Sequence, residues 1–383
     1  MSAPEKNIQL FKPTFRTDEC LEHIKECLDM GWTGMGFKTV ELEDKWKAYT
    51  GHENAHYIAS ATVGLNLALE IFKAEHKWDD ESEIITTPLT FISTNHAILH
   101  NNLKAVFADV DESLCLSPES VKARITDNTK AVMFVGFGGN TGRFKEVVEI
   151  CKEYGLKIIL DAAHMAGTRY LDGTMPGQLA DVTVYSFQAV KNMPTADSGM
   201  ICFADEKFDQ IARKKSWLGI NKDTYARATT EKNNYKWKYD VEYVGHKYHG
   251  NSIIASIGLV QLQYLDQDNE YRRQIASWYQ DGLKDLDQVT VVAMSPECIS
   301  SQHLCQIRAE KRDELLVYLN EQGIYPGVHY TDNTEYKMYS YANGTCPNSL
   351  SFSHELLSLP IHLRLTEDDV AYVVKTIHDF YKG

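Results

Sequence analysis

Short apolar runs alternate with amphipathic stretches through the middle of the chain. Six runs are of strand length and rich in β-branched and aromatic residues: 84–85, 105–109, 131–135, 158–160, 182–185 and 200–203. Most of them are apolar at successive positions, which is typical of strands buried on both faces. The pattern predicts a mostly parallel sheet that is covered by helices.

Helical spacing occurs between and after these runs. Residues 144–154 place apolar side chains on one face, and Gly155 follows as a common helix stop. A second helix is expected at 93–99, and a long one through 256–265 and past 270. The alternation predicts a large α/β domain over residues 1–250 and a smaller α+β domain over 251–383.

Composition narrows the class of protein. The 383 residues are 43% hydrophobic and 24% charged, which is ordinary for a globular protein. A net charge of −14 argues against a nucleic-acid or acidic-membrane partner, because both need clustered positive charge. No apolar run reaches the roughly 18–20 residues that span a bilayer. The start of the chain lacks the apolar core of a signal peptide, so we expect a soluble cytoplasmic protein.

Cysteine and histidine spacing bears on metal chemistry. None of the eight cysteines forms a CxxC pair, which argues against zinc ribbons and iron–sulfur clusters and predicts free thiols. His52–Glu53 and His354–Glu355 lack the HExxH spacing of zinc peptidases, so we expect no metal. The glycine-rich run 136–142 has its third glycine one position late for a dinucleotide loop. We interpret it as a loop on the substrate side.

Two predicted strands end in residues that indicate a ligand site. The run 158–160 leads into Asp161, two small residues and His164. Ligands of open α/β sheets bind beyond the carboxyl ends of the strands, where a buried Asp needs a cation or a protonated heterocycle. The run 182–185 leads into Ser186 and then Lys191, and a desolvated lysine can react with carbonyl groups. Taken singly, a helix cap or salt bridge and a surface lysine explain these residues at least as well.

Two further features suit a flat, phosphorylated ligand. Ser60, Ala61 and Thr62 open an apolar helix, whose N-terminal amides and dipole suit a phosphate. Phe91 follows a strand and can stack on a ring, although an ordinary cap and a core phenylalanine are the simpler interpretations. Together the four features describe a pyridoxal phosphate site. That cofactor needs an anion at its ring nitrogen, a lysine at its aldehyde, an aromatic side chain on its face and helix amides at its phosphate.

The strongest motifs are Asp161-Ala-Ala-His164 and Ser186-Phe-x3-Lys191-Asn192. Weaker ones lie at 31–36, 60–62, 87–94, 107–111, 125–132, 329–330 and 357–370. In this order and spacing the chain resembles the DegT/StrS-type sugar aminotransferases, a branch of the fold-type-I pyridoxal phosphate enzymes, over nearly its whole length. The resemblance implies a three-layer α/β domain with a mostly parallel sheet and a smaller α+β C-terminal domain.

The resemblance also implies roles for individual residues. Lys191 is expected to bind the cofactor aldehyde and move protons, Asp161 to pair with the protonated ring nitrogen, and His164 to pack beside the ring. The implied cofactor-binding residues are Ala61, Thr62, Phe91, Asp161, His164, Ser186, Gln188 and Lys191, with Lys247 supplied by the partner chain. The implied substrate residues are Trp32, Thr33, His249, His329 and Tyr330.

The chain departs from the family pattern in two places. Where the family has TTGEGG, residues 195–199 are Thr-Ala-Asp-Ser-Gly, so two glycines are lost. Where the family has N-Y-R, residues 247–249 are Lys-Tyr-His. Because His249 stands in place of the arginine, the anionic group of the substrate is expected to differ from that of the family. In relatives this second segment crosses a dimer interface to the partner's cofactor phosphate. The resemblance therefore implies a homodimer with shared sites.

The implied function is transamination of a keto-sugar, with glutamate as amino donor and pyridoxamine phosphate as an intermediate. The expected acceptor is a nucleotide-linked 3- or 4-keto-6-deoxy sugar, and the amino-sugar product is destined for surface polysaccharide such as lipopolysaccharide O-antigen. The departures at Lys247 and His249 favour, as an alternative, a free keto-sugar or a keto-sugar acid such as an oxidised octulosonate. The altered segment 195–199 favours a third possibility, a non-catalytic pyridoxal phosphate-binding regulator.

Overall fold

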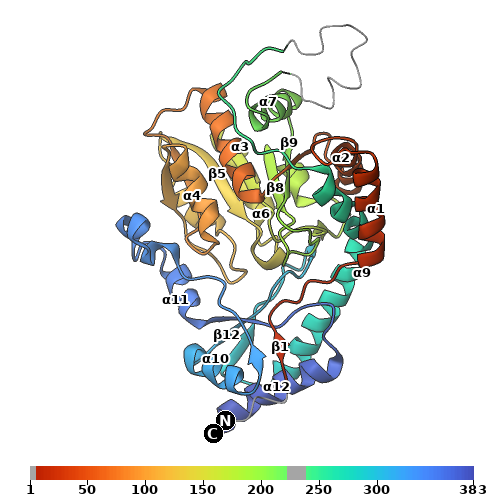
Figure 1. Ribbon diagram of the computed structural model, residues 1–383. Coiled ribbons are helices and arrows are strands. Elements are labelled where there is room, and N and C mark those ends of the chain that lie inside the picture. The colour runs from red at the N-terminus through yellow and green to blue at the C-terminus, as the bar shows by residue number, and fades with distance from the viewer. Residues whose placement is uncertain (1–5, 222–238) are drawn as a thin grey trace.

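The computed structural model describes residues 6–221 and 239–383, which form a larger and a smaller part (Figure 1). Within the described residues, a seven-stranded sheet forms the centre of the larger part. Its strands are β2 (His56–Ile58), β3 (Glu83–Thr86), β4 (Lys104–Phe107), β5 (Thr129–Val135), β6 (Lys157–Asp161), β8 (Val182–Ser186) and β9 (Gly199–Phe203). The spatial order is β2-β9-β8-β6-β5-β3-β4. β9 runs antiparallel to both neighbours, whereas the strands from β8 to β4 are parallel.

Helices cover both faces of this sheet (Figure 1). The helices on one face are α3 (Ala61–His76), α4 (Ile92–His100) and α7 (Glu206–Ser216). Those on the other face are α2 (Phe37–Thr50), α5 (Pro118–Ala123), α6 (Phe144–Tyr154) and the first turns of α9 (Ser252–Leu283). α1 (Thr17–Asp29) packs on α9. The predicted three-layer α/β arrangement is confirmed.

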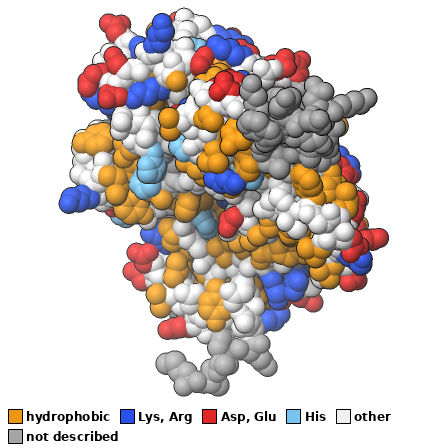
Figure 2. All heavy atoms as spheres, turned by 45° about the horizontal axis from the view of Figure 1, so that its top comes forward, with side chains coloured by type: hydrophobic (Ala, Val, Ile, Leu, Met, Phe, Trp, Pro, Cys, Tyr) orange, Lys and Arg blue, Asp and Glu red, His pale blue; other side chains and the backbone are white. Residues whose placement is uncertain are grey.

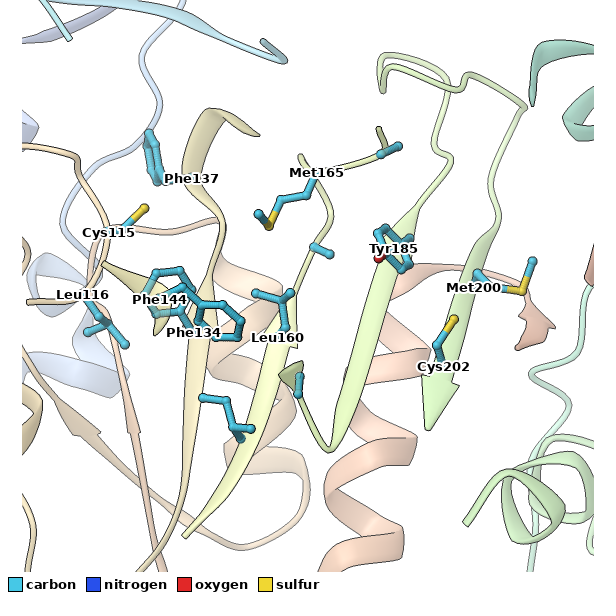
Figure 3. Close-up of a cluster of buried hydrophobic side chains, with 14 of the residues drawn as sticks. Cys115, Leu116, Phe134, Phe137, Phe144, Leu160, Met165, Tyr185, Met200 and Cys202 are labelled. Carbon is cyan, nitrogen blue, oxygen red and sulfur yellow. The ribbon is translucent and has the colours of Figure 1, made fainter. Parts of the chain in front are cut away.

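The apolar runs of the sequence supply side chains to the buried clusters on both faces of the sheet, because successive side chains of a strand point to opposite faces. In β6, Ile158 and Leu160 belong to one buried cluster and Ile159 to the other. Figure 3 shows the first cluster, in which Phe134 from the sheet lies beside Phe144 from α6, with ring centroids 4.7 Å apart. Burial on both faces gives the sheet a rigid carboxyl edge.

The smaller part is built on an antiparallel sheet, as the α+β prediction requires. Its strands are β10 (Val289–Val291), β12 (Cys305–Ala309) and β14 (Leu356–Leu359), in the order β10-β12-β14. Its core also includes α10 (Arg312–Glu321), α12 (Glu367–Lys382) and the last turns of α9. Shorter elements are β1 (Ile8–Gln9), β7 (Arg169–Tyr170), β11 (Cys298–Ile299), β13 (Ile324–Tyr325), α11 (Pro347–Glu355) and the 3-10 turns Phe137–Gly139, Pro176–Leu179, Asn333–Glu335 and Lys337–Ala342.

The chain passes between the two parts more than once. β1 pairs in parallel with β13, so the N-terminal segment joins the smaller part before α1 begins. α9 starts in the core of the larger part, with Ala255 and Leu259, and ends in the core of the smaller part, with Ile275 and Leu283. The domain boundary near residue 250 stays a prediction.

Local helix predictions agree with the structure to within a turn. α6 spans the predicted 144–154, and Gly155 ends it in the left-handed conformation with φ of 65°. α9 begins at Ser252, before the expected 256, because the Asn251 side chain caps it by accepting a hydrogen bond from the Ile254 N–H at 3.0 Å.

Several chemical features of the described residues concern cysteines, metals and membranes. All eight cysteines are free thiols, and seven of them are buried, where they serve as small apolar side chains. In the described ranges no three His, Cys, Asp or Glu side chains converge to hold a metal ion. None of the helices described combines the length and the apolar character that crossing a bilayer requires.

Gly64 provides a test of how tightly α3 packs on the sheet. A Cβ atom at this position would lie 2.5 Å from Ile58 Cδ1 and 2.8 Å from Val184 Cγ1. Because valine is a better helix former than glycine, a loss of stability must come from this overlap. We expect Gly64→Val to lower the free energy of unfolding by about 1–3 kcal/mol, measured by chemical denaturation.

Ala74→Val is the matched control, since Ala74 is exposed on the same helix. Its effect should stay below about 0.5 kcal/mol. A Gly64→Val protein as stable as the native one would contradict the close contact between α3 and the sheet.

Candidate active site

A cavity of about 420 Å³ lies where β5, β6 and β8 end and α3 begins. Ten of the predicted site residues line it: Ala61, Thr62, Phe91, Asp161, His164, Ser186, Gln188, Lys191, His329 and Tyr330. They come from segments far apart in the sequence, between residues 61 and 330. The cavity therefore gathers the predicted cofactor residues, together with two of the predicted substrate residues, into one place.

Asp161 is the last residue of β6 and is buried. The Thr94 hydroxyl donates to its Oδ2 at 2.8 Å, and the Ala163 N–H donates to its Oδ1 at 3.1 Å. Burial raises the pKa of this carboxyl, while both hydrogen bonds and the Lys191 charge act in the opposite direction. The carboxylate is thus held in place and fits a protonated ring nitrogen.

Lys191 lies in a hairpin-like loop over residues 187–198, which follows β8. Backbone hydrogen bonds close the loop, including Phe187 N–H to the Ser198 carbonyl at 2.9 Å. Lys191 lines the cavity, and among the described residues the Asp161 charge acts on its amine without a hydrogen bond. Burial lowers the pKa of Lys191 to about 8, against the opposing charge of Asp161. Near neutral pH a useful fraction of the amine is therefore unprotonated and able to bind an aldehyde.

The altered segment 195–199 does not need the two glycines that the family pattern has there. Neither position 196 nor position 198 has a positive φ, so side chains fit without strain. The Ser198 hydroxyl lies 2.8 Å from the Thr195 hydroxyl and braces the loop. Glycine is kept at 199, where a Cβ atom would lie only 2.9 Å from the backbone nitrogen of Ala61. This close approach joins the start of β9 to the start of α3.

The N-terminus of α3 forms one end of the cavity. The Ser60 hydroxyl caps the helix by accepting from the Val63 N–H at 3.3 Å, while Ala61 and Thr62 line the cavity. Backbone N–H groups at a helix start attract a phosphate through their dipoles. Ser186, at the end of β8, adds a hydroxyl to this group. These donors suit the phosphate of the cofactor.

Aromatic rings and imidazoles form another wall. Phe91 is 57% exposed, and its ring centroid lies 5.9 Å from that of Tyr330. His164 Nδ1 accepts a hydrogen bond from the Gly138 N–H at 3.2 Å, and its Nε2 lies 3.3 Å from the Tyr330 hydroxyl. The proton of the neutral ring is therefore on Nε2. Burial lowers the pKa of His164 well below its usual range, so the ring is neutral.

The donor set fits pyridoxal phosphate. The cavity holds a carboxylate for the ring nitrogen, an unpartnered amine for the aldehyde and an exposed phenyl ring for the face, in Asp161, Lys191 and Phe91. Helix amides and hydroxyls remain for the phosphate. The fit rests on residue chemistry and on the free Lys191 amine.

Four predicted residues do not line the cavity of this chain. Trp32 donates from Nε1 to the Met35 carbonyl at 2.8 Å, and the Thr33 carbonyl accepts from the Ser252 N–H. Lys247 holds its amine 3.8 Å above the Trp217 ring, and the His249 ring meets the same ring edge-on at 4.6 Å. The cofactor and substrate roles of Trp32, Thr33, Lys247 and His249 stay predictions.

Several cavity residues were not predicted. Thr94 lies in the first turn of α4, and its hydroxyl lies 3.1 Å from that of Thr90, which precedes the helix. Phe11 and His303 come from distant segments and carry no local motif. Asp197, within the altered segment 195–199, also lines the cavity.

The pKa of Lys191 can be measured directly. In protein freed of pyridoxal phosphate, we expect reductive methylation of Lys191 to be half-maximal at about pH 8, because burial favours the neutral amine. Peptide mass spectrometry reads the modification at each lysine. Lys104 is the internal control, because its hydrogen bond with Glu81 raises its pKa and shifts its reaction to higher pH. A Lys191 midpoint as high as that of Lys104 would contradict the assignment.

Known proteins resemble this chain in sequence and in fold. The pattern of the DegT/DnrJ/EryC1/StrS aminotransferase family matches residues 15–378. The spore coat polysaccharide biosynthesis protein SpsC of Bacillus subtilis (strain 168) is 32% identical over 377 residues, which cover 95% of each chain. The aminotransferase TlmJ from Streptoalloteichus hindustanus has a similar structure, with a TM-score of 0.89, 28% identity, and coverage of 98% of this chain and 99% of the other.

A third relative was solved with its cofactor. The putative sugar aminotransferase Spr1654 from Streptococcus pneumoniae, in its PMP form, matches with a TM-score of 0.86 at 26% identity, covering 97% of this chain and 98% of the other. A PLP form of the same protein also matches. The chain described here belongs to the DegT/DnrJ/EryC1/StrS aminotransferase family and is a pyridoxal phosphate-dependent sugar aminotransferase.

Proposed function

We propose that this enzyme transfers the amino group of glutamate to the ketone of a nucleotide-linked 3- or 4-keto-6-deoxy sugar, by way of pyridoxamine phosphate. The observation that carries the proposal is that Lys191, whose amine has no hydrogen bond or ion pair within the described part of the chain, and the buried carboxylate of Asp161 line one cavity. The cofactor needs the amine at its aldehyde and the carboxylate at its ring nitrogen.

Each residue has a task that follows from its surroundings. When bound, pyridoxal phosphate supplies the electron sink for the reaction. The hydroxyl of Thr94 and the N–H of Ala163 favour the ionised form of Asp161, against the effect of burial. Lys191 takes and returns a proton at Nζ, a task that suits an amine with a pKa of about 8. His164 and Tyr330 cover one side of the cavity and exclude water from it.

The lining of the cavity suits a sugar ring. Neutral imidazoles, a phenol and small hydroxyl side chains are groups that exchange hydrogen bonds with a polyol. The name of SpsC, a spore coat polysaccharide biosynthesis protein, supports a surface polysaccharide as the destination of the product. We therefore place the amino-sugar product in polysaccharide synthesis.

One observation favours the alternative acceptor, a free keto-sugar. Among the described residues that line the cavity, Lys191 is the one lysine or arginine, so this wall offers no cation for a diphosphate. The same lack disfavours a keto-sugar acid such as an oxidised octulosonate, which carries a carboxylate. A nucleotide-linked acceptor must therefore place its diphosphate outside this wall.

In this proposal the active form is a homodimer, in which Lys247 reaches the cofactor phosphate of the partner subunit. Lys247 is exposed, and the segment that carries it lies beside β2, where Ala59 N–H donates to the Tyr248 carbonyl at 2.7 Å. Figure 2 shows hydrophobic side chains gathered over much of one face of the molecule. Exposed apolar residues of the first two helices and of the 241–244 segment support an interface: Leu21, Leu28, Met30, Val40, Val241 and Val244.

The absorbance spectrum of the purified enzyme tests the reaction. We expect a yellow band from cofactor bound through Lys191, which excess glutamate bleaches because the amino group moves to the cofactor. The keto-sugar that restores the band is the acceptor. Lys191→Ala is the control, and it should bind the cofactor without bleaching.

The outcomes separate the alternatives. A band that glutamate leaves unchanged, with other amino donors equally inactive, would support the non-catalytic regulator instead. Restoration of the band by a free keto-sugar and not by nucleotide-linked sugars would contradict the nucleotide-linked acceptor.

Mixing two inactive variants tests the shared site. Lys191→Ala and Lys247→Ala proteins are co-refolded or co-expressed, and turnover is measured at limiting pyridoxal phosphate. If Lys247 serves the partner subunit, each mixed dimer has one intact site, so about a quarter of native activity should return. Without exchange of residues across the interface both sites of a mixed dimer stay impaired. Activity that does not exceed the sum of the two separate variants would contradict the proposed role of Lys247.

A further inference from the structure

The segment 300–303, which leads from the smaller part of the molecule into β12, lies against loops that build the cavity. The Ser301 hydroxyl donates to the His164 carbonyl at 2.6 Å. The His303 N–H donates to the Gly138 carbonyl at 2.9 Å. These two contacts tie the segment to the loops that follow β6 and β5.

A third loop, the one that carries Lys191, is held through the next residue, Asn192. Its Nδ2 donates to Asn269 Oδ1 and to the Ser301 carbonyl, each at 2.7 Å, which leaves Oδ1 as the acceptor. His303 Nδ1 lies 2.8 Å from this Oδ1 and therefore carries the proton of the ring. Asn192 is buried, so its Oδ1 would have no water to replace the imidazole donor.

The His303 ring also packs against its neighbours. Its centroid lies 4.3 Å from that of His164 and 5.5 Å from that of Phe11. His164 in turn accepts at Nδ1 from the N–H of Gly138, whose carbonyl accepts from His303. The two histidines and Gly138 form a closed circuit of contacts, so a displaced His303 displaces His164 as well.

We propose that His303 is a positioning residue, whose ring and Nδ1–H hold His164 and Asn192 and thereby set the direction of the Lys191 amine in the cavity. The inference rests on the proposed function, in which Lys191 carries the proton, and it adds a residue that this function has not used. His303 acts through its neighbours.

The charge state of His303 fits this task. Burial lowers its pKa well below the usual range, as do the nearby His164 and Lys191, so the ring stays neutral. A neutral donor fixes Asn192 without adding a positive charge beside Lys191. The titratable groups that interact electrostatically with Lys191 are Asp161, His164, His303 and His329.

Two substitutions separate the hydrogen bond of His303 from its bulk. His303→Phe keeps a flat ring against His164 and loses the donor to Asn192. His303→Gln keeps a donor and loses the ring. In cofactor-free protein we expect His303→Phe to raise the midpoint of Lys191 methylation by about one pH unit, because the loosened loop admits water to the amine.

The loaded enzyme gives a second readout. The rate of the glutamate half-reaction should fall about 100-fold in His303→Phe, with the half-saturating glutamate concentration changed less than about threefold, since orientation is lost and not binding. The rate in His303→Gln should be at least about tenfold higher than in His303→Phe. The methylation midpoint needs no turnover, so it tests His303 even if glutamate is not the donor.

His52→Phe is the matched control. His52 is also buried, with a pKa lowered to about 4 by burial, but it contacts the Tyr185 hydroxyl and does not line the cavity. It should leave the Lys191 midpoint unchanged. If His303→Phe does not fold, Asn269→Ser, which loosens Asn192 and keeps the His303 ring, must raise the midpoint instead. An unchanged midpoint in the variants that fold, with an unchanged rate, would overturn the proposal.

Discussion

The buried amine of Lys191, which forms no ion pair among the described residues, is the constraint on which the rest of this site depends. Desolvation destabilises the charged form of Lys191 more than the carboxylate of Asp161 stabilises it, so the pKa of the amine falls to about 8. The amine keeps this property only while its loop stays closed and dry. The backbone pairs of the 187–198 loop and the side-chain contacts of Asn192 hold it in that state. Reactivity toward a carbonyl group therefore follows from packing.

Apart from Lys191 itself, the described walls of the cavity carry no lysine or arginine, which limits where a negatively charged ligand can bind. Burial keeps His164, His303 and His329 below their usual pKa range, so they donate and accept hydrogen bonds without competing for anions. The phosphate end is left to the amides at the start of α3 and to hydroxyl groups. A ligand that brings several negative charges needs cations from outside the described wall. Whether the acceptor carries a diphosphate therefore depends on whether the partner subunit supplies such cations.

Both parts of the molecule build the cavity. The larger part supplies Asp161 and Lys191 from strand ends that are rigid because both faces of the sheet are buried. The smaller part supplies His303 and Tyr330, and the N-terminal segment adds Phe11. Since β1 pairs with β13 before the chain reaches α1, the N-terminal segment is anchored where it can pass the cavity. A relative shift of the two parts would change the wall around the amine and leave the strand ends in place.

The sequence by itself determined the layers of the fold and the residues with a strong local signal. Fully apolar strands predict a sheet buried on both faces; Asp161 ends one such strand, and Lys191 lies in the loop after another. The tertiary structure alone decided the contacts of His303 and Phe11 and the exclusion of Trp32 and Lys247 from this chain's cavity, because these depend on segments far apart in sequence. It also decided the antiparallel β9, since an apolar run carries no direction. Local sequence patterns reflect the burial and the periodicity of each element, whereas contacts between distant side chains depend on the path of the whole chain.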